Sequence, residues 1–171
     1  MKRGKIREPR DGESSFDIYR EGDTTRSIHL TVNLVIVARR WRSLLDERLR
    51  LIGQSSARME AMAAILNSPT LRAQVDIARR LRIEGPTMTR MLDSLEADLL
   101  VERLPAPEDR RTKQLRLTAL GESTLEQIFG IADELRARLL QGVSNEAVDE
   151  LNSILEVLSA RLDTGLPDSE A

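Results

Sequence analysis

The chain contains no cysteine and only one histidine, His29, among its 171 residues. The lack of cysteine excludes disulfide bonds, thiolate nucleophiles, cysteine-ligated zinc and thiol-based redox sensing. A single imidazole is also too few for a histidine-based metal site. We therefore expect no metal and no cofactor, and the function must rest on other side chains.

Aromatic residues are scarce as well, at 2% of the chain, whereas 40% of the residues are hydrophobic and 32% are charged. A core must then be built from Leu, Ile, Val, Ala and Met, a composition that favours packed helices. No stretch approaches 18 consecutive apolar residues, and the basic N-terminus lacks the apolar run that a secretory signal needs. These features predict a soluble protein of the cytoplasm.

The sequence patterns of enzymes are missing too. There is no phosphate-cradling glycine loop, no metal-ligand spacing and no pair of carboxylates in a recognisable cleft motif. We therefore expect a protein that is not an enzyme. The formal net charge of −2 does not bear on nucleic-acid binding, because phosphate is attracted by a local basic patch and not by the sum over the chain.

Apolar residues recur every three or four positions in several long segments, which is the spacing of amphipathic helices. Gly53 and the Ser68-Pro69 pair are the clearest stop signals between them. The long helices predicted in this way cover about residues 29–52, 55–66, 118–142 and 144–165.

Residues 1–27 are polar and charged, so we expect a flexible N-terminal arm, in which Phe16–Tyr19 docks on the body of the protein or on a partner subunit. Residues 164–171 are expected to form a flexible tail.

Two short helices joined by a tight turn are predicted in the middle of the chain. The first covers residues 71–81, the chain breaks at 82–84, and the second covers 85–100 with Pro86 in its first turn. This length and spacing are typical of a helix-turn-helix. The residues of the second helix that we expect to face inward are Met88, Met91, Leu92, Leu95 and Leu99.

Two strand-like runs, 101–104 and 114–117, follow the helix pair and are joined by a polar segment rich in arginine. The second run alternates apolar and polar residues, as a half-buried hairpin strand does. An arginine-rich hairpin tip is typical of a wing. The sequence thus predicts a mainly α fold with a small β-hairpin. Its expected parts are a winged helix-turn-helix DNA-binding lobe over 67–118 and a helical dimerisation region over 28–66 and 119–163.

Three pieces of the stretch from Val75 to Gly121 resemble the MarR (multiple antibiotic resistance regulator) family of winged helix-turn-helix transcription regulators. They are IEGPTMTRMLDSLE at 83–96, DRRTK at 109–113 and LRLTALG at 115–121, in the family's order and at its spacing. With a weaker likeness at 41–49, the resemblance covers roughly residues 30–162. It implies a ligand-responsive regulator that binds double-stranded palindromic DNA as a homodimer. We expect a repressor that a small aromatic or phenolic acid releases from its operator.

In the predicted recognition helix, Thr87, Thr89 and Arg90 suit the first turns, because small polar and cationic side chains there can enter the roughly 12 Å wide major groove. Threonine can donate to a base or a phosphate or touch a thymine methyl group, and arginine can reach guanine or a phosphate. An ordinary surface helix that begins with proline would show the same pattern. The DNA-binding candidates in this part are Arg82, Gly85, Pro86, Thr87, Thr89 and Arg90.

In the wing, the resemblance implies that Arg111 enters the minor groove and that Asp109 braces it. A guanidinium fits a narrow, negative minor groove, and a nearby carboxylate can hold it in one rotamer. Arg110 and Lys113 would then contact phosphate. Taken alone, such a run is usually a solvated charged turn, and its place between two strands is what favours DNA.

This chain departs from the family at two positions where glycine is common, the turn of the helix-turn-helix and the residue after the recognition helix. Arg82 and Leu99 stand there. If the backbone keeps a positive φ, each residue costs on the order of 1 kcal/mol; otherwise the turn geometry differs. Arg82 could instead add a phosphate contact.

The resemblance also implies a pocket for a small, often aromatic, anionic effector where the first two long helices meet the helix after the wing. The candidates are His29 and Arg39 for the anionic group, and Trp41, Met59 and Met62 for an apolar wall. The alternative is that Trp41 and the methionines belong to the core and that Arg39 is solvated.

Two interpretations of the whole chain stay open at this point. One is a DNA-binding regulator, and the other is a helical protein-interaction module that uses the winged fold without DNA. A complex held by phosphate contacts weakens steeply as salt rises, so the salt dependence of a gel shift separates the two.

Overall fold

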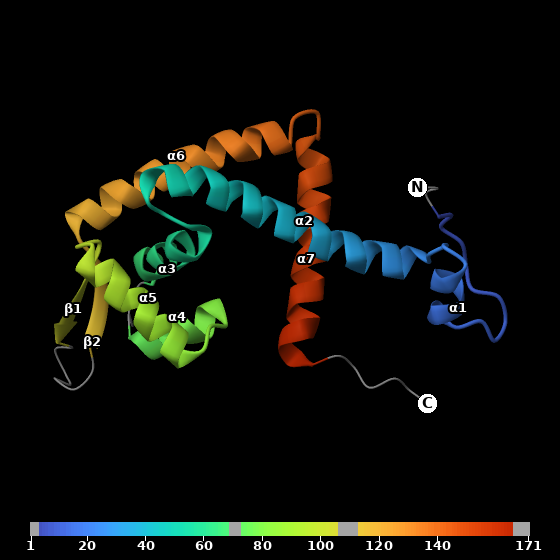
Figure 1. The fold of residues 1–171 in the computed structure, drawn as a ribbon, viewed down its shortest axis with the longest axis horizontal. Helices are drawn as coiled ribbons and strands as arrows, with labels where there is room; N and C mark the ends of the chain where they lie inside the picture. The colour runs from blue at the N-terminus through green and yellow to red at the C-terminus, as the bar shows by residue number, and fades with distance from the viewer. Residues whose placement is uncertain (1–3, 69–72, 106–112, 166–171) are drawn as a thin grey trace. The chain divides into compact units, whose positions relative to one another are not determined.

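A computed structural model describes residues 4–68, 73–105 and 113–165, in two compact units, Met1–Ile131 and Ala132–Ala171 (Figure 1). The mainly helical fold with one two-stranded hairpin that the sequence predicted is confirmed. In chain order the elements are α1 (Ser15–Arg20), α2 (Arg26–Leu49), the short 3-10 helix η1 (Arg50–Ile52), α3 (Ser56–Leu66), α4 (Gln74–Leu81), α5 (Gly85–Ala97), β1 (Val101–Pro105), β2 (Lys113–Leu117), α6 (Ala119–Leu139) and α7 (Asn145–Thr164).

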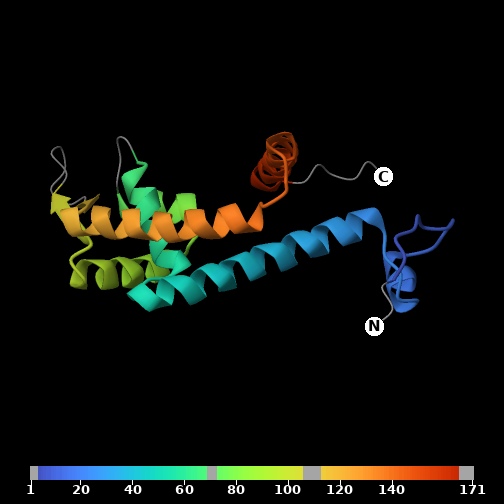
Figure 2. The same ribbon diagram turned by 90° about the horizontal axis from the view of Figure 1, so that it is seen from above.

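Helix α2 is a single continuous helix that leads from α1 to α3 (Figure 2). It begins at Arg26, three residues earlier than the period of apolar residues indicated. The side chain of Thr25 caps this start by accepting from the Ile28 N–H at 3.3 Å. Only its last turns are buried, at Leu45 and Leu49. The preceding turns leave their apolar side chains exposed within the described chain.

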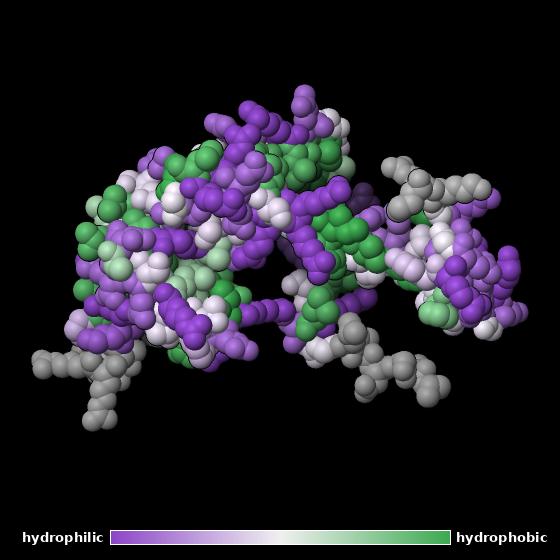
Figure 3. Space-filling view, in the orientation of Figure 1, coloured by the Kyte–Doolittle hydropathy of each residue, from purple (hydrophilic) through white to green (hydrophobic). Residues whose placement is uncertain are grey.

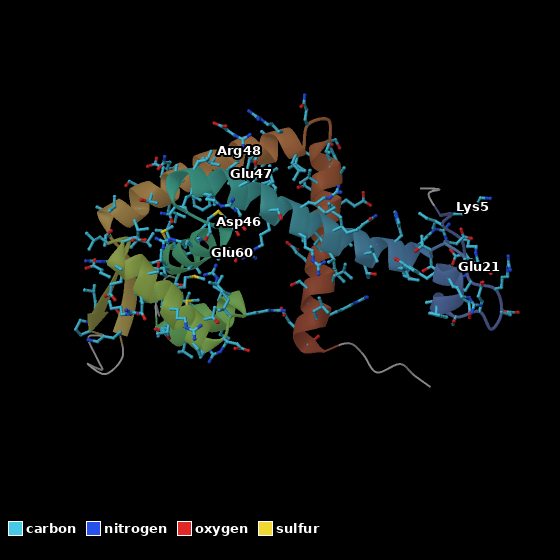
Figure 4. The ribbon with its side chains drawn as sticks, viewed as in Figure 1. Lys5, Glu21, Asp46, Glu47, Arg48 and Glu60 are labelled. Carbon is cyan, nitrogen blue, oxygen red and sulfur yellow. The ribbon has the colours of Figure 1, made fainter. Side chains whose placement is uncertain are left out.

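The joint between α2 and α3 is held by polar side chains on both helices. The Asp46 carboxylate accepts a 2.6 Å hydrogen bond from the Ser56 backbone N–H at the start of α3, and Arg42 pairs with Glu60 at 3.3 Å. Figure 4 shows Asp46 and Glu60 at this joint. Burial is the largest single influence on the pKa of Asp46 and raises it, but hydrogen bonding with Ser56 and the charges of Arg42 and Arg50 together outweigh burial and leave that pKa below its ordinary value.

The core of the first unit lies where α3, α4, α5 and the hairpin come together (Figure 1). Complete burial of one large aliphatic side chain contributes about 1.5–3 kcal/mol, so the fully buried residues dominate the stability of this lobe. They are Met62 and Ile65 of α3, Ile77 of α4, Met88, Leu92 and Leu95 of α5, and Leu115 of β2, each at most 1% exposed.

The hairpin pairs β1 and β2 antiparallel, from Val101 opposite Leu117 to Pro105 opposite Lys113. Its strands match those predicted and extend them by one residue each. A further single bridge joins Ala73, just before α4, to Gln114. The hairpin is therefore tied to the start of α4 as well as to α5.

The backbone at Arg82 and Leu99 is left-handed, with φ of 53° and 60°. The chain thus keeps the positive φ that glycine would adopt freely. The inward placement expected for Leu99 was wrong, because its side chain is 68% exposed. The reversal after α5 turns Leu99 to solvent, and the next residue, Leu100, is the one that is buried.

A close contact secures the start of α6. The Thr118 hydroxyl donates to the Leu99 carbonyl at 2.6 Å and accepts from the Gly121 N–H at 3.0 Å, so Thr118 caps the start of α6. A methyl group on Gly121 would lie 2.0 Å from the Leu100 carbonyl oxygen. Only glycine fits there without movement of the backbone.

In the second unit, Ser144 caps α7 by accepting from the Ala147 N–H at 3.2 Å. Figure 3 shows hydrophobic surface at the turn between α6 and α7. The exposed large apolar residues of this unit are Leu139, Leu140, Val143, Leu151, Ile154, Val157 and Leu162. Even so, none of the helices in the described part of the chain is both long and apolar enough to span a membrane.

The structure differs from the flexible arm expected at the N-terminus. The Arg7 guanidinium pairs with three carboxylates, those of Glu13 at 2.6 Å, Glu21 at 3.0 Å and Asp23 at 3.1 Å, and Ile18 of α1 is fully buried. The hydrogen bond from Arg7 lowers the pKa of Glu13 to about 2. The composition of this segment predicted disorder because it is rich in charged residues. In the structure these charged residues form ion pairs with one another. Figure 4 labels Lys5 and Glu21 in this segment.

Replacing Leu99 with glycine should stabilise the protein, because glycine adopts a positive φ without strain and little burial is lost. We expect Leu99→Gly to raise the free energy of unfolding by about 1 kcal/mol in urea denaturation. Leu51→Gly is the matched control, since Leu51 is 81% exposed in η1 and its φ is not positive. The control should lower stability, and an equal loss in both variants would contradict strain at Leu99.

Candidate nucleic-acid interface

Helices α4 and α5 are joined by a tight turn that a left-handed residue makes possible. Arg82 has φ 53° and ψ 41°, and the Ile83 N–H donates back to the Ala78 carbonyl at 3.0 Å. Glu84 then adopts an extended conformation and leads into α5, whose first turn contains Pro86. The two helices and the turn between them form the helix-turn-helix predicted from the sequence.

The side chains of α5 divide between a buried and an exposed face. Met88, Leu92 and Leu95 have no exposed surface. Because this face packs against α4 and β1, the opposite face must point to solvent. The predicted DNA-binding residues Gly85, Pro86, Thr87, Thr89 and Arg90 are all exposed on α5, and Arg82 is exposed in the preceding turn.

Two arginines that sequence reasoning missed hold α5 in place. From α3, Arg58 donates to the Ser94 hydroxyl at 2.7 Å and to the Asp98 carboxylate at 2.6 Å. From β1, Arg103 donates to Asp93 at 2.6 Å and also to Glu96. These partners lie 7 to 40 residues apart in the sequence, and no local pattern pairs them.

The charge on Arg103 is stabilised by its partners. Burial lowers the pKa of Arg103, but the hydrogen bond from its guanidinium to Asp93 and the charge of Glu96 outweigh this effect and raise the pKa above its ordinary value. The guanidinium thus remains a permanent cation that ties the wing to the recognition helix.

A hydrogen bond also links the first residue of α4 to the exposed face of α5. The Gln74 side-chain N–H donates to the Thr89 hydroxyl oxygen at 2.6 Å, and the Thr89 hydroxyl donates to the Gly85 carbonyl at 3.0 Å. Gln74 was not among the residues singled out from the sequence. The apolar period of the helix identifies residue 74 as a polar position, but it does not identify Thr89 as the partner of Gln74.

Cationic side chains flank this face. Arg79 and Arg80 of α4 are exposed; Arg79 pairs with Asp76 at 3.4 Å, and Arg80 donates to the Asn67 carbonyl at 3.2 Å. Lys113 is exposed at the first position of β2. The predicted wing residues Asp109, Arg110 and Arg111 lie outside the described residues.

The effector candidates do not form one wall within a single chain. His29 lines a hollow of about 750 Å³ together with residues of the N-terminal segment and Asn33. Arg42, which pairs with Glu60 of α3, lies thirteen positions further along α2, or about 20 Å along a helix. Of the other candidates, Arg39 is exposed, Trp41 and Met59 are half-buried, and Met62 is fully buried.

Comparison with known proteins gives this arrangement a class. The model of the MarR family matches residues 55–113. The crystal structure of transcriptional regulator PA3341 is 32% identical, with a TM-score of 0.72, and the match covers 80% of this chain and 99% of that one. The chain therefore belongs to the MarR family of winged helix-turn-helix transcriptional regulators. It is a DNA-binding regulator by class and not an enzyme.

Two further structures agree with this assignment. MarR from E. coli, as a cysteine-to-serine mutant complexed with operator DNA, is 26% identical with a TM-score of 0.69, over 77% of this chain and 94% of that one. BldR from Sulfolobus solfataricus is also 26% identical, with a TM-score of 0.66, over 76% and 94% of the two chains.

The bonds from Arg103 to α5 should be measurable as a coupling energy. We expect Arg103→Met to lower the free energy of unfolding by about 1 kcal/mol, since it leaves two like charges three residues apart on α5. In a double-mutant cycle with Asp93→Asn and Glu96→Gln, part of that loss should be restored. Strict additivity in urea denaturation would mean that these ion pairs contribute nothing.

Proposed function

We propose that the chain binds a palindromic operator as a homodimer, with α5 in the major groove and the hairpin at the adjacent minor groove. One observation supports this proposal more than the others: α5 buries Met88, Leu92 and Leu95 completely and presents Thr87, Thr89 and Arg90 to solvent. These are the side-chain types that contact base edges and phosphates.

The spacing of the exposed residues supports insertion of α5 into a groove. Thr87 and Arg90 are three residues apart and so lie on the same side of the helix. Arg82 precedes them in the turn, and Lys113 stands at the base of the wing. The wing residues Asp109, Arg110 and Arg111 keep the roles that the family resemblance implies, with Arg111 in the minor groove.

The relatives support the same ligand. The E. coli MarR structure holds operator DNA, and a complex of MepR from S. aureus with DNA shares the fold with a TM-score of 0.67. This chain has a formal net charge of −2, so attraction to DNA must come from local cations. The arginines of α4, the turn and α5, together with Lys113, supply them.

A second copy of the chain would cover apolar surface that one copy leaves open. Helix α7 exposes Leu151, Ile154, Val157 and Leu162, and none of its described residues is buried. Helix α2 likewise exposes Leu30, Val32, Leu34, Val35, Ile36 and Val37. Exposed apolar faces of this extent mark association surfaces. In a symmetric dimer the two α5 helices would stand about one DNA turn apart, roughly 34 Å.

The proposed division of labour follows from these surfaces. Residues 67–118 form the DNA-binding lobe, and 28–66 with 119–163 form the dimerisation region. We also propose that a small anionic aromatic molecule controls operator binding, as the family resemblance implies. A ligand that binds the two dimer geometries with different affinity shifts their populations and weakens the complex by a few kcal/mol.

Loss of Arg90 should weaken DNA binding without unfolding the protein. With DNA from upstream of the protein's own gene, we expect Arg90→Ala or Arg111→Ala to cost about 1–3 kcal/mol of affinity. Gel shifts at several salt concentrations measure this cost. Arg48→Ala is the matched control, since it removes the same charge from an exposed position on α2 and should bind like the wild type. Equal affinity for all variants would contradict the proposed interface.

The dimer can be tested at a residue whose substitution should be harmless in a monomer. Val157 on α7 is 51% exposed, so Val157→Lys should fold, but we expect it to sediment as a monomer and to lose operator binding. Ser159→Lys, exposed on the same helix, should remain a dimer. A dimeric Val157→Lys variant would place the interface elsewhere.

A further inference from the structure

The hydroxyl of Thr89 is already used inside the protein. It donates its single proton to the Gly85 carbonyl at 3.0 Å, and its oxygen accepts from the Gln74 side-chain N–H at 2.6 Å. A hydroxyl has one proton and two lone pairs. Thr89 therefore has no proton to offer to DNA, although its side chain is exposed on the face that would enter the groove.

This limits what Thr89 can recognise. Guanine O6 and N7, thymine O4 and the phosphate oxygens all need a hydrogen-bond donor. The Thr89 hydroxyl does not provide one, because its proton is already bonded to the Gly85 carbonyl. The two hydrogen bonds also fix the rotamer of Thr89, so its γ-methyl group has one direction. The apolar feature of the major groove is the methyl group of thymine.

We propose that Thr89 reads a thymine through its γ-methyl group and that Gln74 is the positioning residue that keeps the hydroxyl engaged. The inference rests on the proposed binding of operator DNA. Gln74 suits this role because its own backbone is held on two sides. It is the first residue of α4, and the bridge from Ala73 to Gln114 ties the preceding residue to the wing.

Thr87 provides an internal comparison. It is exposed on α5 two residues earlier, and within residues 4–68, 73–105 and 113–165 no hydrogen bond to its hydroxyl is found. Its proton is free to reach a base or a phosphate. The same substitution, threonine to valine, should therefore change the affinity little at position 89 and lower it clearly at position 87.

The experiment begins with a duplex selected from a random pool by the wild-type protein. Each thymine is then replaced by deoxyuridine, which removes only the C5 methyl group. We expect one symmetry-related pair of positions to lose about fourfold in affinity for each methyl group, the effect of one apolar contact. The ratio of thymine to uracil affinity at that pair is the readout for the variants.

Thr89→Val keeps a methyl group and should retain both the affinity, within about threefold, and the thymine to uracil ratio. Thr89→Ser keeps the hydroxyl but should bring the ratio to one. Gln74→Leu should reduce the ratio while the melting temperature stays unchanged, which a merely structural role would not produce. Thr87→Val should lose about tenfold in affinity.

Three results would overturn the inference while leaving DNA binding intact. The first is a selected duplex in which no position is sensitive to deoxyuridine. The second is a Thr89→Val variant that loses as much affinity as Thr87→Val while its melting temperature is unchanged. The third is a Gln74→Leu variant that keeps the wild-type ratio of thymine to uracil affinity. Failure of the wild-type protein to enrich any duplex would instead overturn the proposed function itself.

Discussion

The burial of one face of α5 is the constraint on which the rest of the arrangement depends. Met88, Leu92 and Leu95 have no exposed surface, and their loss from the core would cost several kcal/mol. This burial sets the rotation of the helix about its axis and so decides which residues it presents to solvent, where the proposed DNA interface lies. Arg58 and Arg103 then hold its C-terminal half from α3 and from β1.

Among the described residues, the two non-glycine residues with a positive φ also lie in this region. Arg82 and Leu99 stand in left-handed conformations on either side of α5, where glycine would be unstrained. The strain at Arg82 is accompanied by a cation at the start of the recognition helix, which a glycine at this position would not supply. Leu99 makes no comparable contribution through its exposed side chain, but its carbonyl accepts from Thr118 and so helps to begin α6.

Helices α2 and α7 show the opposite situation, with apolar residues but little burial. A helix of this length is stable in water mainly through the burial of its apolar face. Their exposed stripes are the surfaces that the proposed dimer would cover, and in that dimer the position of each DNA-binding lobe would depend on its partner. An effector that alters this assembly would act on DNA binding without touching α5.

Helix boundaries, caps and the hairpin could be predicted from sequence, because they follow from local periodicity and from residues such as Thr118 and Ser144 that act within one turn. The exposed residues of α5 followed from the same periodicity. The ordered N-terminal segment, the outward turn of Leu99 and the bond from Gln74 to Thr89 depended on the tertiary structure. The first and the third of these features join side chains that are distant in sequence, and the second depends on a reversal of the backbone. Contacts between distant residues and backbone reversals leave no periodic signal along the chain.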